Sequence, residues 1–229
     1  MRLLLGIIAG LIVTDLVKAA VGTVELTSPL ASFRSDDFAL AAAALVFVTR
    51  VLIDNSLYYA RPDAKTRTSV YVVRLFLIIC DLISYSLCYF IVVHTERLSS
   101  APDYNNRLRA IAHAAVIIEG LHFIWCVTAL AGLEISQGSD DYKSRRSWLK
   151  KWAWLSGSFA ALGAIPLLLA YCRVWLTPDW LAFIVLFSMA STLAYVCFMK
   201  TEYLGNWKAA VRPAKTNSAT SNLPGSSDT

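Results

Sequence analysis

The stretch from Trp180 to Met199 reads WLAFIVLFSMASTLAYVCFM, and it decides the class of fold. None of its side chains is charged, and its length matches the roughly 20 apolar residues that a helix needs to cross the hydrocarbon core of a bilayer. The preceding run, at about 148–172, is also uncharged in its interior. Both runs predict membrane-spanning helices, joined by a hairpin turn from Arg173 to Pro178.

The composition of the whole chain agrees with this prediction. Hydrophobic residues make up 57% of the 229 residues and charged residues only 16%, with a mean hydropathy of +0.54. A soluble domain carries about 25% charged residues, so a chain this apolar could not cover its surface with polar groups. The composition therefore excludes a soluble enzyme, a disordered chain and a nucleic-acid-binding module.

Four further apolar runs precede these two, and isolated charges interrupt each of them. We therefore predict an all-α fold, a polytopic membrane bundle of six helices that forms one domain over residues 1–200. A cytoplasmic, largely disordered tail is expected over 201–229, where polar residues dominate near the end. The predicted helices cover about 3–22, 37–60, 69–94, 108–133, 148–172 and 178–199.

The first predicted helix has a second interpretation as a secretory signal peptide. Arg2 precedes the uncharged run Leu3–Thr14, as in the basic and apolar regions of such peptides. The nearest cleavage site, ending at Ala20, would place Lys18 where a small residue is required. A retained helix is therefore the preferred interpretation.

The distribution of Lys and Arg predicts the orientation of the bundle. With a cytoplasmic N-terminus, the inner segments hold thirteen of these residues and the outer segments hold five, in agreement with the positive-inside rule. Both termini are therefore predicted to be cytoplasmic, and the pI of about 9.0 reflects this bias. The inner loop before the fifth helix is also a candidate site for anionic lipid headgroups, although topology alone explains its charges: Lys143, Arg145, Arg146, Lys150 and Lys151.

Ionisable side chains lie inside each of the first four predicted helices. Near the bilayer centre such a group costs roughly 2.5–3.5 kcal/mol, so it persists where it faces the bundle and finds a partner. Within each helix the two groups are three, four or seven residues apart and therefore share one face. The pairs are Asp15 and Lys18, Arg50 and Asp54, Arg74 and Asp81, and Glu119 and His122.

These faces predict a polar interior enclosed by the first four helices. Estimated depths favour an Asp54–Arg74 pair on the cytoplasmic side, as a structural or gating contact. Near the midplane they favour a pair of Arg50 with Asp81 or Glu119. Asp15 and Lys18 form an outer charged pair.

A channel or transporter for protons or small cations is the leading functional hypothesis. The acids near the midplane exceed what Arg50 can neutralise, and such a surplus is typical of proton and cation pathways. A histidine has an unperturbed pKa of about 6.5, so His122 beside Glu119 is a candidate for relaying protons. The transport or relay candidates are Asp81, Glu119, His122 and Arg50.

Two other functions fit the same sequence. The chain is a candidate non-catalytic subunit or scaffold that docks on itself or on a larger membrane complex through its fifth and sixth helices. It is also a candidate membrane-embedded enzyme for a lipid or isoprenoid, with Asp81 or Glu119 as general acid. No motif indicates a cofactor or a metal, because the three histidines lie at different depths or phases and the five cysteines form no C-x-x-C pair.

Overall fold

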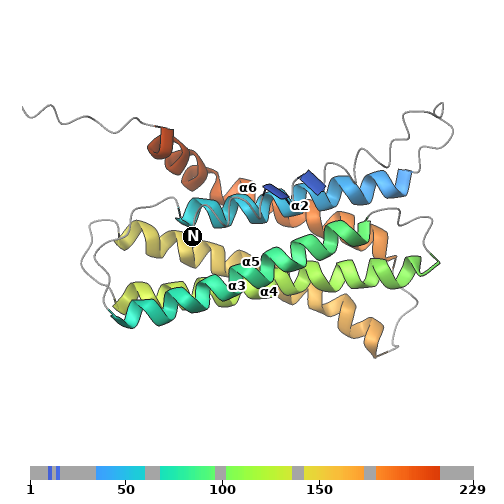
Figure 1. Cartoon of the computed structure of the whole chain (residues 1–229), viewed down its shortest axis with the longest axis horizontal. Helices are drawn as coiled ribbons and strands as arrows, with labels where there is room; N and C mark the ends of the chain where they lie inside the picture. Colours follow the sequence, from blue (N-terminus) through green and yellow to red (C-terminus); the bar gives the residue numbers. More distant parts are fainter. Residues whose placement is uncertain are drawn as a thin grey trace, which may run out of the picture.

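A computed structural model describes residues 10–11, 14–15, 35–59, 68–95, 102–135, 142–172 and 179–211. Within these ranges the regular secondary structure is helical, with five long helices and no strand. The helices lie along the long axis of the molecule and alternate in direction (Figure 1). They are α2 (Ser35–Tyr59), α3 (Thr68–Thr95), α4 (Tyr104–Ile135), α5 (Tyr142–Tyr171) and α6 (Trp180–Val211).

Four of these helices contain a segment that is long and apolar enough to cross a membrane. The segments are Tyr71–Thr95, Tyr104–Leu133, Arg146–Tyr171 and Trp180–Phe198. They support the prediction of a multipass membrane protein. The first predicted helix, at 3–22, falls mostly outside the described residues. Within that range the structure describes Gly10, Leu11, Thr14 and Asp15, and these four residues are helical.

The sixth helix begins close to its predicted start and continues beyond its predicted end. Asp179 stands directly before α6, and its Oδ1 accepts a hydrogen bond from the N–H of Ala182 at 3.1 Å, as an N-cap residue does. The helix runs on to Val211, so the first part of the predicted tail is helical. Apolar character ends at Met199, but a helix needs only its own backbone hydrogen bonds, and no proline occurs until Pro213.

The helices pack around α4, which contacts α3, α5 and α6. Helix α2 packs mainly against α6 and also against α3. Two apolar clusters result. One joins α2 to the C-terminal half of α3 and the N-terminal halves of α4 and α6, with Phe47, Ile118 and Phe187 among its members. The other joins α3, α4 and α5 around Trp125 and Trp152 and includes Tyr195 of α6.

Close helix contact is possible because α5 has glycines on its inner face. A Cβ atom at Gly163 would lie 2.6 Å from Cγ2 of Val116 and 2.9 Å from Cε2 of Phe187. A Cβ atom at Gly157 would lie 2.9 Å from Cδ2 of Phe123. These small residues let α5 approach α4 and α6 closely, as is common where helices pack in membranes.

Large apolar side chains also cover the outside of the bundle. They are exposed on each of the four apolar helices and not on α5 and α6 alone, as the following pairs illustrate: Val72 and Leu75 on α3, Ile117 and Val127 on α4, Leu162 and Leu168 on α5, Leu186 and Leu193 on α6. Soluble proteins rarely expose apolar surface on this scale. Such an exterior is suited to contact with acyl chains.

Candidate functional site

An ion pair joins α2 and α4 in the interior of the bundle. Nη2 of Arg50 lies 2.7 Å from Oε1 of Glu119, and the two side chains are only 4% and 0% exposed. The contact is a charge-assisted hydrogen bond, which is short and strong for its kind. The sequence predicts Asp81 or Glu119 as the partner of Arg50, and this ion pair is with Glu119.

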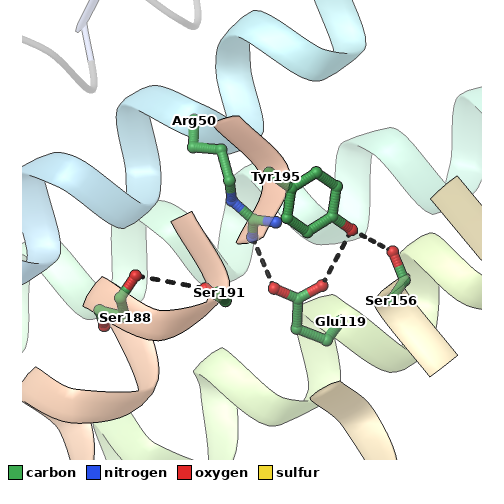
Figure 2. Close-up of polar contacts among 6 residues, drawn as sticks. All are labelled: Arg50, Glu119, Ser156, Ser188, Ser191 and Tyr195. Atoms are coloured by element: carbon green, nitrogen blue, oxygen red, sulfur yellow. Dashed lines mark hydrogen bonds and ion pairs between the residues drawn. The ribbon is translucent and has the colours of Figure 1, made fainter. Parts of the chain in front are cut away.

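Tyr195 of α6 completes the surroundings of both side chains (Figure 2). Its ring centroid lies 4.2 Å from Cζ of Arg50, and the ring of Phe47 lies 4.8 Å from the same atom. Its hydroxyl donates a long hydrogen bond of 3.4 Å to Oε2 of Glu119. Each carboxylate oxygen of Glu119 therefore accepts a hydrogen bond from a different helix.

Ser156 extends the network to a fourth helix. Its hydroxyl is hydrogen-bonded to the Tyr195 hydroxyl, and both groups are fully buried. Figure 2 shows the resulting chain of contacts from Arg50 through Glu119 and Tyr195 to Ser156. The network thus draws one residue from each of α2, α4, α5 and α6.

This arrangement corrects the prediction that the first four helices alone form the polar interior. The predicted fifth and sixth helices carry no charge in their interiors, and the sequence therefore favours contact of both with lipid or a partner. In the structure α6 packs between α2 and α4, so one of its faces is interior. The spacing of polar residues in the sequence indicates this interior face, because Ser188, Ser191 and Tyr195 are three and four residues apart and therefore share one side of α6. All three are buried in the structure.

His122 lies one helical turn from Glu119 on the same face of α4. It is 1% exposed, and its ring packs against Trp152 with centroids 5.7 Å apart. Neither ring nitrogen of His122 has a hydrogen-bond partner within the described part of the chain, and neither does Nε1 of Trp152. Buried polar groups of this kind are uncommon in folded proteins.

Asp54 and Asp81 are also buried, on α2 and α3 respectively. Arg74 is half-buried on α3, which packs against α2. The Asp54–Arg74 pair stays a prediction.

The remaining predicted residues lie away from this centre or outside the described residues. Asp15 is half-buried, whereas its predicted partner Lys18 is not among the described residues. In the proposed lipid-binding loop, Arg146 is half-buried and Lys150 and Lys151 are exposed near the start of α5. The side chains of Lys143 and Arg145 lie outside the described part.

The site is a buried ion pair extended by hydroxyl groups. It brings together a carboxylate, a guanidinium and two hydroxyls in a bundle interior between two apolar clusters. Electrostatic interactions are strong in such surroundings because little water screens them. No family model, curated protein or solved structure matches this chain, and its function is inferred from this geometry.

Proposed function

We propose that the protein is a small membrane channel or transporter that moves protons or small cations through the interior of its helical bundle. The central observation is the position of Glu119, a fully buried carboxylate whose two oxygens are bound by Arg50 and Tyr195 from two other helices. A carboxylate in this position can exchange a proton or an ion only with groups of the bundle interior. This supports its role as the transported ion's binding site.

The balance of buried groups around Glu119 also supports transport. Three carboxyl groups are buried within the described residues, those of Asp54, Asp81 and Glu119, against a single buried guanidinium, that of Arg50. Burial of charge is costly, so such groups are stabilised by a proton, a bound cation or a neighbouring cationic side chain. Exchange of a proton or a cation at such carboxyl groups is what transport through the bundle interior requires.

The alternatives have less support. Docking through α5 and α6 has no observation of its own, because α3 and α4 expose comparable apolar side chains. An enzyme that used Glu119 as general acid would need that side chain to reach a substrate, whereas Glu119 is fully buried within the bundle.

Flux through liposomes reconstituted with the purified full-length protein tests the proposal. Glu119→Gln is expected to abolish proton or cation flux that the wild type supports. The double variant R50Q/E119Q is expected to do the same, and it removes both members of the ion pair together. Asp103→Asn is the matched control, because it breaks an exposed 2.9 Å ion pair with Arg107 at the start of the same helix. Undiminished flux in both site variants would contradict the proposal.

A further inference from the structure

We infer that the transported ion is the proton, bound at Glu119, and that Tyr195 and Ser156 are positioning residues that set the pH at which it is taken up. This inference rests on the proposed function and specifies its substrate. It follows from how the donors around Glu119 are arranged.

The surroundings of Glu119 are unsuited to a metal cation. Oε1 lies 2.7 Å from the permanently charged guanidinium of Arg50, which would repel any cation placed at that oxygen. Hard cations bind several oxygen ligands at once, yet both oxygens of Glu119 already accept hydrogen bonds. In the described ranges no group of three or more His, Cys, Asp or Glu side chains is placed to hold a metal ion. Helical backbone carbonyls are largely engaged within their own helices.

A proton requires none of these ligands. It occupies one lone pair of the carboxylate and leaves the other oxygen free to accept a hydrogen bond. When Glu119 is neutral, Arg50 still has the rings of Phe47 and Tyr195 beside it, at 4.8 and 4.2 Å. Cation–π attraction then continues to stabilise the buried guanidinium. The two rings therefore offset part of the loss of the carboxylate charge when Glu119 takes up a proton.

Tyr195 and Ser156 act on this proton through a single chain of hydrogen bonds. The Tyr195 hydroxyl donates to Oε2 of Glu119, and Ser156 is bonded to the same hydroxyl. A hydrogen bond donated to a carboxylate favours its charged form. Loss of the Tyr195 hydroxyl is therefore expected to let Glu119 keep its proton to a higher pH.

The substitutions Tyr195→Phe and Ser156→Ala change only hydroxyl groups near Glu119. Helix α2 contributes the charged groups Arg50 and Asp54, and α6 contributes Tyr195. The charged and titratable groups of α3 and of α4 itself are Arg74, Cys80, Asp81, Tyr85, Cys88, His122 and Cys126, while α5 contributes the neutral Ser156. Tyr195→Phe and Ser156→Ala leave all the charged groups in place. A shift in pH dependence thus reports on the hydroxyl chain.

The test measures three fluxes in liposomes that hold the full-length protein: protons with an entrapped pH-sensitive dye, and radioactive sodium and rubidium at the same membrane potential. We expect proton flux alone. Tyr195→Phe is expected to move the midpoint of its pH dependence upward by about 0.5–1 unit. Ser156→Ala is expected to move it in the same direction by less.

Matched controls come from α3, where the same side chains are exposed. Tyr89→Phe and Ser86→Ala remove hydroxyls far from the buried network and are expected to leave the midpoint unchanged. The elution of each variant in detergent is compared with that of the wild type, and an unchanged elution shows that the variant folds.

Each result distinguishes the inference from the function on which it rests. If sodium or rubidium moves through the wild type and pH has no effect, the proton assignment is overturned while the proposed transport function stands. Absence of all three fluxes in the wild type would overturn the transport function itself. If protons move but the midpoint of the pH dependence of flux is the same for Tyr195→Phe as for Tyr89→Phe, the positioning role of Tyr195 is overturned.

Discussion

The guanidinium of Arg50 contacts the carboxylate of Glu119 and two aromatic rings, and these contacts help to hold a full charge inside an apolar bundle. Glu119 supplies the opposite charge at 2.7 Å, while Phe47 and Tyr195 present their rings to the cation. Arginine suits this position better than lysine would, because its planar group can pair with a carboxylate and stack on rings at the same time. The residue thus links three helices through one side chain.

A double-mutant cycle measures how much the interaction between Arg50 and Glu119 contributes to the free energy of unfolding. Arg50→Gln or Glu119→Gln alone leaves a buried charge without its partner, and we expect each to destabilise the protein by about 3–5 kcal/mol. The double variant R50Q/E119Q removes both charges and is expected to lie much closer to the wild type. Heat or SDS unfolding in detergent micelles, followed by tryptophan fluorescence, gives the three values. Additive losses in the double variant would show that the two side chains do not depend on each other.

Among the helices, α5 packs closely against α4 and α6 at Gly163. Gly163 lies where a side chain would meet both Val116 of α4 and Phe187 of α6. Neither neighbour can yield easily, since one is short and branched and the other is a rigid ring in the core. The same helix carries Ser156 inward, so its approach also places a member of the polar network.

Substitution of two glycines tests this packing. Gly163→Ala is expected to destabilise the fold by about 1–3 kcal/mol through overpacking, reduced by the better helix propensity of alanine, which is worth about 0.5–1 kcal/mol. Gly120→Ala on α4 is the control, because a Cβ atom there has no neighbouring atom within 4 Å. That variant is expected to be neutral or slightly stabilising in the same unfolding assay. Equal effects of the two variants would rule out close packing as the reason for Gly163.

The whole molecule places its polar centre between two apolar clusters and surrounds both with apolar surface. One cluster lies around Phe47 and Phe187, the other around Trp125 and Trp152. Since the helices alternate in direction, each end of the bundle collects the ends of all five described helices (Figure 1). The orientation of the bundle in the membrane thus follows from the side on which any one helix ends.

Cysteine labelling tests that orientation. Cys172 is exposed at the C-terminal end of α5, whereas Cys88 and Cys126 are fully buried. The predicted orientation, with both termini cytoplasmic, places Cys172 on the outer side. A membrane-impermeant maleimide added to intact cells is therefore expected to label the wild type and not Cys172→Ser. Labelling of Cys172 only after permeabilisation would invert the orientation, and with it the predicted side of the C-terminus.

The amino-acid sequence by itself determined which segments are apolar helices, because the capacity to cross a bilayer is a property of one continuous run of side chains. It also singled out Arg50 and Glu119, since a charge within such a run is costly and noticeable wherever it occurs. Tertiary structure alone decided that these two residues meet and that Tyr195 and Ser156 join them. Partner choice depends on how neighbouring helices are rotated about their axes, and that rotation is set by packing between distant apolar faces such as those at Gly163 and Phe187. Hydroxyl groups on uncharged helices lie in the interior for the same reason, and no local pattern of charge reveals them.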